Sequence, residues 1–178
     1  PGNYTVNKSG KRFANESQNY LTFMLEVLRK QEQGESFTPM YMIFDSNHRK
    51  NYPVGPLMPG KFFPDPLVKF VHRNWFNDDF ITRANSIQEL AQKTGINPDG
   101  LEDTIQKVNK FSETGKDIDF QRGDNERDRF SGDQSLINPC LGPVNQAPYY
   151  AMRIDPGEFA TCGGMAINEY GQVLNNDN

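Results

Sequence analysis

The first clear periodic pattern in the chain lies in residues 20–28, where apolar side chains recur three and four positions apart. This spacing places them on one face of a helix, so we predict an amphipathic helix that packs against the rest of the protein. Ser17 is the expected N-cap, because its hydroxyl can accept a hydrogen bond from the first turn. Gly34 is the expected end, since glycine readily adopts the left-handed backbone that terminates helices.

Two further helices are predicted from start and stop signals. Ser86 and Glu89 form a capping-box pattern at the start of the first, and Gly95 ends it. Asn97 and Pro98 then begin the second, because proline is well tolerated in a first turn that follows an amide cap. The apolar stripe of this second helix comprises Leu101, Ile105, Val108 and Phe111.

Strand-like runs alternate with these helices. Residues 4–13 are predicted to form a hairpin closed by a Ser-Gly turn. The run over 38–44 is apolar on both faces and is typical of a buried strand. A short strand is expected over 80–84, and another begins at the pair Tyr149 and Tyr150.

Two other segments are predicted to be irregular. Residues 51–66 contain five prolines and two glycines, a density that regular elements do not tolerate. Because irregular segments of this length are uncommon without a role, we predict a surface loop that serves as a lid or a pocket wall. The mixed-charge run over 124–133 is expected to be a solvated loop.

Composition and charge narrow the functions open to the chain. Its 178 residues, 12% of them aromatic, suffice for one domain with a sizeable core. The formal net charge of -4 argues against a nucleic-acid partner, because phosphate binding needs a positive field. No apolar run is long enough to span a membrane, so no span is predicted.

The cysteines and histidines indicate no metal chemistry. Cys140 and Cys162 lie outside any zinc-ligand spacing. His48 and His72 have no second ligand at helical spacing. We therefore predict no metal site, and two scattered thiols favour a reducing, cytoplasmic location.

Several blocks of sequence resemble, in order, the fumarate reductase and 3-ketosteroid dehydrogenase flavoproteins. The segment GKRFANES followed by Tyr20 is similar to the G-R-F-x-N-E segment of that family. SIQELAQKTGINPDGLEDTIQKVNKF is similar to its paired cap-domain helices. DFQRG, a later Gly-Asp pair, NPCLGP, APYYA and TCGG look most like the ketosteroid dehydrogenase branch. The resemblance extends from Gly10 to Leu174.

This resemblance implies a two-domain oxidoreductase in which a small cap domain covers FAD bound in a larger domain. Residues 1–146 are assigned to the cap, or substrate, domain, and 147–178 to strands that lead back into an FAD-binding domain. The implied fold of this chain is α+β, with a small, mostly antiparallel sheet, packed helices and no Rossmann sheet. The chain contains no G-x-G-x-x-G motif to cradle a pyrophosphate. We therefore expect FAD to bind the full-length protein and not this fragment alone.

One catalytic residue is implied by the resemblance. In the ketosteroid branch, a cap-domain tyrosine just after the N-E pair accepts a proton from the carbon next to a ketone, and a hydride passes to flavin. Tyr20, four residues after Glu16, is the matching position. Tyr20 also lies on the apolar stripe of the first predicted helix, so ordinary packing is the alternative. For Arg12 and Glu16, which recur in the family, a local salt bridge is the favoured interpretation.

The flavin contacts are also implied by the resemblance. Thr161, Gly163 and Gly164 match the T-x-G-G step whose backbone lies against the flavin ring in the family. Glycine is needed there because a Cβ would collide with the ring. The alternative is a β-bulge with no ligand. Cys162, at the variable position of the step, is expected to be a small buried side chain.

The candidate substrate contacts are Tyr149, Tyr150 and Phe159. The two tyrosines must face opposite sides of their strand, and core packing is the alternative role for each. Fumarate-type members carry histidines just before the T-x-G-G step, where this chain has Glu158, Phe159 and Ala160. Because a dianion cannot be buried unpaired, these residues favour an apolar, steroid-like ketone over a dicarboxylate.

Three functions follow as hypotheses. The favoured one is a fragment, inactive alone, of an FAD-dependent oxidoreductase that desaturates a 3-ketosteroid-like substrate. The second is the cap domain of a fumarate reductase-type flavoprotein. The third is a non-catalytic α+β binding module, which the missing FAD motifs support. A parent reading frame roughly two to three times longer, with G-x-G-x-x-G near its start, would exclude the module.

Overall fold

The structure is a computed structural model, and it describes residues 1–34, 37–72, 75–77, 79–157 and 164–175. Within these residues, four strands form one antiparallel sheet in the order β1-β2-β4-β3. The strands are β1 (Asn3–Val6), β2 (Met40–Asp45), β3 (Ile81–Ala84) and β4 (Tyr149–Ile154). The helices are α1 (Tyr20–Glu32), α2 (Ser46–Asn51), α3 (Asp65–Val71), α4 (Ile87–Thr94), α5 (Pro98–Thr114) and α6 (Glu126–Phe130). This arrangement confirms the predicted α+β class.

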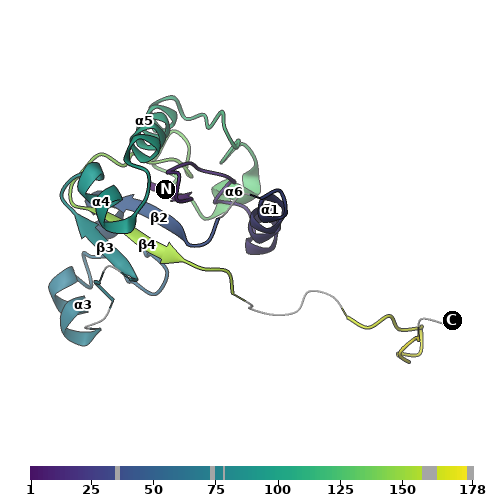
Figure 1. The fold of residues 1–178 in the computed structure, drawn as a ribbon. Coiled ribbons are helices and arrows are strands. Elements are labelled where there is room, and N and C mark those ends of the chain that lie inside the picture. The colour runs from purple at the N-terminus through teal and green to yellow at the C-terminus, as the bar shows by residue number, and fades with distance from the viewer. Residues whose placement is uncertain (35–36, 73–74, 78, 158–163, 176–178) are drawn as a thin grey trace.

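One face of the sheet is covered by α4 and α5 (Figure 1). Alternate strand residues, among them Tyr41, Ile43 and Ala151, pack with both helices in a single core. The capping box of α4 is present: Ser86 Oγ accepts a hydrogen bond from the N–H of Glu89 at 3.1 Å. The predicted stripe of α5 is buried in the same core, and comprises Leu101, Ile105, Val108 and Phe111.

The opposite face of the sheet carries two separate clusters. Near β3 and β4, Phe44 and Tyr150 stack with ring centroids 5.1 Å apart, and Val68 of α3 packs with them. Nearer to α1, a second cluster comprises Phe13, Ala14, Val27, Phe37 and Met40. Because side chains alternate along a strand, α1 and α3 both lie on the face turned away from α4 and α5.

The last strand of the sheet, β4, is an inner strand. It pairs with β2 from Met40–Ile154 to Asp45–Tyr149, and β3 lies on its other side. β4 follows the predicted domain boundary at residue 146, and the assignment of 147–178 to return strands stays a prediction. Further on, Ile167 and Val173 form an isolated antiparallel bridge.

The entry into α1 differs from the prediction. The expected N-terminal hairpin is reduced to an isolated bridge between Val6 and Arg12. Ser17 was the wrong cap: Asn19 Oδ1 accepts from the N–H of Thr22 at 2.9 Å, so α1 begins at Tyr20. Ser17 is occupied elsewhere, because its hydroxyl accepts a hydrogen bond from a distant arginine.

The proline-rich segment 51–66 is held by one arginine from α2. Arg49 donates to the carbonyl oxygens of Met58 and Phe63, both at 2.8 Å. Its Nε lies 3.0 Å from a carboxylate oxygen of Asp65. The expectation of a wholly irregular segment was wrong at its end, since α3 begins at Asp65. A buried cation thus fixes this loop and the start of α3.

The mixed-charge run 124–133 is also more ordered than predicted. It contains α6, which Asn125 caps by accepting from the N–H of Asp128 at 2.9 Å. The carboxylate of Asp128 is buried and accepts from Asn15 Nδ2 at 2.8 Å and from the N–H of Gly123 at 3.0 Å. The run was misjudged because its partners come from distant parts of the chain.

Candidate functional site

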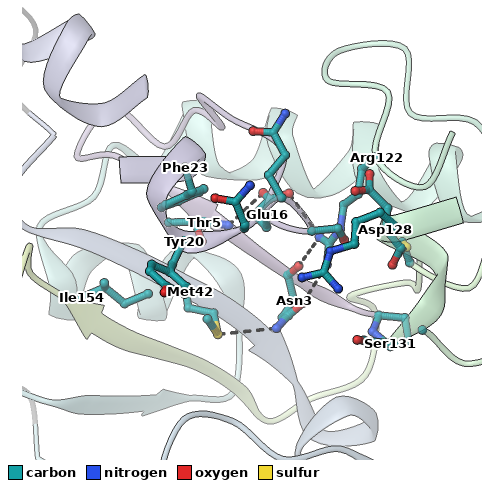
Figure 2. A pocket seen from close by; sticks show the side chains of 17 residues that line it. Asn3, Thr5, Glu16, Tyr20, Phe23, Met42, Arg122, Asp128, Ser131 and Ile154 are labelled. Atoms are coloured by element: carbon teal, nitrogen blue, oxygen red, sulfur yellow. Dashed lines mark hydrogen bonds and ion pairs between the residues drawn. The ribbon is translucent and has the colours of Figure 1, made fainter. Parts of the chain in front are cut away.

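A cavity of about 610 Å³ opens on the face of the sheet that carries α1 (Figure 2). Its floor comes from the strands, one wall from the start of α1, and the other wall from the segment around α6. The apolar part of the lining comprises Tyr20, Phe23, Met42 and Ile154. The polar part includes Asn3, Thr5, Glu16, Arg122, Arg127, Asp128 and Ser131. The cavity therefore has an apolar end and a polar end.

Tyr20 lies at the apolar end of this cavity. It is the first residue of α1, and 66% of its surface is exposed. Figure 2 shows its side chain on the same side of the cavity as Met42 and Ile154. A proton acceptor must be reachable by a substrate, and this position meets that requirement. The catalytic role of Tyr20 stays a prediction.

The polar wall is built on a buried ionic network centred on Arg12. Arg12 donates from Nε and Nη2 to the two carboxylate oxygens of Glu16, at 2.9 and 2.8 Å. It also donates from Nη1 and Nη2 to Asp117, at 3.1 and 2.8 Å. All three side chains are less than 10% exposed. The predicted salt bridge between Arg12 and Glu16 is confirmed.

Arg122 is a second cation in this network that sequence reasoning missed. Its Nη1 donates to the carbonyl oxygen of Asn3 at 2.7 Å and lies 3.2 Å from Glu16. Its Nε donates to Ser17 Oγ at 2.9 Å. Two guanidinium groups therefore hold Glu16 in place beside the cavity. The DFQRG block, which contains Arg122, was a family signal, but no local pattern pairs it with a glutamate 106 positions earlier.

The network makes the stability of the domain depend on acid pH. Burial alone would raise the pKa of Asp117, but the hydrogen bonds and charge of Arg12, with two backbone N–H groups, outweigh it. The pKa of Asp117 in the folded protein therefore lies below its ordinary value of 3.8. A carboxylate with a depressed pKa stabilises the fold above its unfolded pKa and loses that contribution as pH falls through the folded value.

We therefore expect the wild type to lose its stability advantage over Asp117→Asn in acid. The difference in their free energies of unfolding should be constant from pH 7 to about pH 5 and should shrink below about pH 4. Urea unfolding of both proteins, followed by circular dichroism at several pH values, measures this difference. A gap that stayed constant down to pH 3 would show that Asp117 does not titrate in this window.

The candidate substrate tyrosines lie outside this cavity. Tyr150 is buried, and its hydroxyl donates to Asp65 Oδ2 at 2.7 Å. Tyr149 packs against the core on the other face of the sheet. The structure thus does not bring either of them to Tyr20. Their role in substrate binding stays a prediction, and Phe159 lies outside the described residues.

The candidate flavin contacts are described in part. Thr161, Cys162 and Gly163 lie outside the described residues. Gly164 is exposed, and a Cβ built there would meet no heavy atom of the chain within 4 Å. Gly157 is equally open. The described residues therefore show exposed glycine backbone at Gly164 and no pyrophosphate cradle, and the flavin contact of this step stays a prediction.

The described residues offer neither a cluster of metal ligands nor a membrane-spanning helix. They contain no group of three or more His, Cys, Asp or Glu side chains that could hold a metal ion. Among the helices described, none has the length and apolar character needed to cross a membrane.

The described residues thus form a small α+β fold with an open, half-apolar cavity beside α1. The chain belongs to the FAD binding domain family, whose model matches residues 1–178. It is 36% identical, over 183 aligned residues, to the 3-oxosteroid 1-dehydrogenase of Mycolicibacterium smegmatis. That match covers 99% of this chain and 31% of the relative, so the chain spans about a third of its length.

Solved structures agree with this assignment. The crystal structure of 3-ketosteroid delta1-dehydrogenase from Sterolibacterium denitrificans, in complex with 1,4-androstadiene-3,17-dione, matches with a TM-score of 0.91 and 36% identity. The match covers 99% of this chain and 31% of that one. The resemblance to the ketosteroid dehydrogenase branch is therefore confirmed.

A more distant match has the fold alone in common with this chain. The solution structure of a fumarate reductase flavoprotein subunit from Lactobacillus plantarum matches with a TM-score of 0.57 and 21% identity. It covers 91% of this chain and 88% of that one. A chain of nearly this extent with the same fold therefore exists in solution as a separate polypeptide.

Proposed function

We propose that the full-length protein is an FAD-dependent oxidoreductase that desaturates a 3-ketosteroid or a similar bulky cyclic ketone, and that this chain forms its substrate-covering domain. One observation carries the proposal: Tyr20, at the position of the family's proton acceptor, lies exposed at the apolar end of the cavity of about 610 Å³. As a phenolate, its oxygen takes the proton from the carbon next to the ketone, and the adjoining carbon loses a hydride, so that a C=C bond forms between them. When bound, FAD supplies the hydride acceptor.

The other side chains of the cavity bind and position the substrate. Phe23, Met42 and Ile154 provide an apolar surface for a fused ring system and exclude water from it. Tyr20 opens α1, and the N–H groups of a first helical turn favour negative charge beside them. The anion of Glu16 is balanced by its two arginines, so this wall does not repel the phenolate that accepts the proton.

The fumarate-type alternative has less support. A dicarboxylate needs cationic side chains that are not already neutralised. Arg12 is bound to Glu16 and Asp117, and Arg122 to Glu16 and the backbone of Asn3, which leaves Arg127 of the lining to meet a dianion. We also propose a cytoplasmic location, supported by the free, buried thiol of Cys140.

The test of the function uses the full-length protein. We expect it to purify with a yellow flavin, and anaerobic addition of 3-ketosteroids from a panel should bleach the flavin absorbance. Fumarate should not reoxidise the reduced flavin at a comparable rate. A protein without flavin, or one whose flavin responds to fumarate and to none of the steroids, would overturn the proposal.

The 178-residue chain alone is expected to purify colourless and to show no dehydrogenase activity with an artificial electron acceptor. The reason is the lack of a pyrophosphate cradle, because binding of the dinucleotide depends on such a turn at a helix N-terminus. Visible absorbance of the purified chain measures this directly. Stoichiometric FAD absorbance would contradict it.

A further inference from the structure

The loop before α3 and one side of α3 expose large apolar side chains. Phe62 and Phe70 are 69% and 75% exposed. The exposed set, called the α3 patch from here on, comprises Met58, Phe62, Leu67, Phe70 and Val71. Large apolar side chains exposed in such number within one short segment are typical of a contact with another molecule or with a membrane.

The spacing along α3 indicates that its exposed apolar residues form a second apolar side, separate from the side that packs on the core. Leu67, Phe70 and Val71 stand at i, i+3 and i+4, which places them on one side of the helix. Val68 is the buried residue of the helix and packs with the cluster on the sheet. The helix therefore has an apolar side toward the core and a second apolar side toward solvent, and such a helix needs cover on both.

The segment that carries the patch has an excess of basic residues in an acidic chain. Residues 46–76 contain five basic residues and one acidic residue, whereas the whole chain has a formal net charge of -4. Four of the five lie among the described residues: Arg49, Lys50, Lys61 and Lys69. The acidic one, Asp65, is already bound to Arg49. The positive charge of the lysines is thus available to an outside partner.

Two of these lysines lie beside aromatic rings. Lys61 Nζ is 5.1 Å from the centroid of the Phe62 ring, and Lys69 Nζ is 5.8 Å from that of Phe76. Lysine above an aromatic surface can keep its ammonium group at a polar boundary while its stem and the ring lie in an apolar layer. Each of these lysines therefore places a positive charge beside an aromatic ring.

The patch is presented by a fixed support. Arg49 holds the carbonyl oxygens of Met58 and Phe63 and the carboxylate of Asp65. Tyr150, from the inner strand β4, donates to the same carboxylate. Figure 1 shows α3 at the periphery of the fold, on the far side of the sheet from α5. The patch is thus anchored to the core while it projects from the domain.

We propose that the α3 patch is a peripheral contact with an anionic phospholipid bilayer. The phenylalanines and aliphatic side chains enter the boundary between headgroups and acyl chains, and Lys61 and Lys69 meet the lipid phosphates. Charge complementarity selects this partner. In a two-fold dimer through the same patch, the lysines of one copy would face those of the other, which is unfavourable.

The experiment is co-sedimentation of the full-length protein with vesicles of phosphatidylcholine alone or mixed with phosphatidylglycerol. We expect the partition coefficient to be at least about tenfold higher on the anionic vesicles and to fall as salt is raised. Phe62→Ser/Phe70→Ser should lower it by at least about tenfold, since two apolar side chains no longer leave water. Lys61→Glu/Lys69→Glu should abolish the preference for anionic vesicles.

Matched variants control for general surface effects. Ile118→Ser/Phe130→Ser removes two apolar side chains of similar exposure elsewhere, and Lys110→Glu/Lys116→Glu reverses two exposed charges on and after α5. Both controls should bind vesicles as the wild type does. All variants should keep their flavin and their turnover of a soluble ketone, so a failure of membrane binding is distinguishable from a failure of the proposed function.

Three outcomes would overturn the proposal. The first is vesicle binding that neither patch variant weakens. The second is a full-length protein that does not bind while the 178-residue chain does, which would assign the patch to the rest of the protein. The third is a dimer in light scattering that Phe62→Ser/Phe70→Ser dissociates, which would assign it to a second copy.

Discussion

Tyr20→Phe in the full-length protein is expected to lower the turnover of a 3-ketosteroid by about 10² to 10⁴, the usual cost of losing a general base. The substitution removes only the phenolic oxygen from a side chain that is largely exposed. The free energy of unfolding should therefore change by no more than about 1 kcal/mol, and the FAD content should not change. Steady-state kinetics with the flavin-to-protein ratio measured on the same sample gives both values.

Tyr41→Phe is the matched control for this experiment. Its hydroxyl donates to the carbonyl oxygen of Thr94 at 3.2 Å on the opposite face of the sheet, so its loss should affect stability and not turnover. If Tyr20→Phe keeps near-normal turnover, Tyr20 only packs at the rim of the cavity. The proton acceptor must then lie in another part of the protein.

Arg12→Met is expected to lower the free energy of unfolding by about 3 to 5 kcal/mol, because it leaves Asp117 buried without a cation and Glu16 with one of its two. Glu16 would retain Arg122 at 3.2 Å, whereas Asp117 would retain only its backbone donors. Methionine fills much of the same volume, so the change reports mainly on charge. Urea unfolding of the isolated domain is the measurement.

Two comparisons make this result interpretable. Arg29→Met removes a cation from an exposed pair with Glu26, and its cost should stay below about 1 kcal/mol. Arg12→Lys keeps the charge but cannot form bidentate hydrogen bonds to both carboxylates. Its free energy of unfolding should therefore lie between those of the wild type and Arg12→Met. If Arg12→Met does not fold, Arg12→Lys still gives a measurable value. A cost of Arg12→Met as small as that of Arg29→Met would refute the structural role.

Features of the fold that depend on neighbouring residues were predictable from the sequence. The cap at Ser86, the αL glycine after α4 and the cap at Asn97 all involve partners within a few positions, and each is present. Spacing alone also placed the four apolar residues of α5 on one buried face. Hydrogen bonds within a turn and the 3.6-residue period both require particular residue types at fixed short spacings, and these spacings can be read from the sequence.

The candidate site was predictable only in part, because its polar wall joins distant segments. Arg12 and Asp117 are 105 positions apart, and Asp128 pairs with Asn15 across 113. Neither separation leaves a periodic signal, and a mixed-charge run looks solvated when its partners are unknown. Tyr20 was found by a family pattern, whereas the cavity it faces depends on how three strands and two helical segments meet.

The order of strands in the sheet also constrains how the domain is made. A ribosome releases β1, β2 and β3 before β4, yet β4 is the strand that must stand between β2 and β3. Until residue 154 has emerged, β3 has no strand to pair with, and one edge of β2 is open to other chains. Nascent chains that stall before residue 149 are therefore ready substrates for chaperones and proteases, since the sheet is completed only by its last strand.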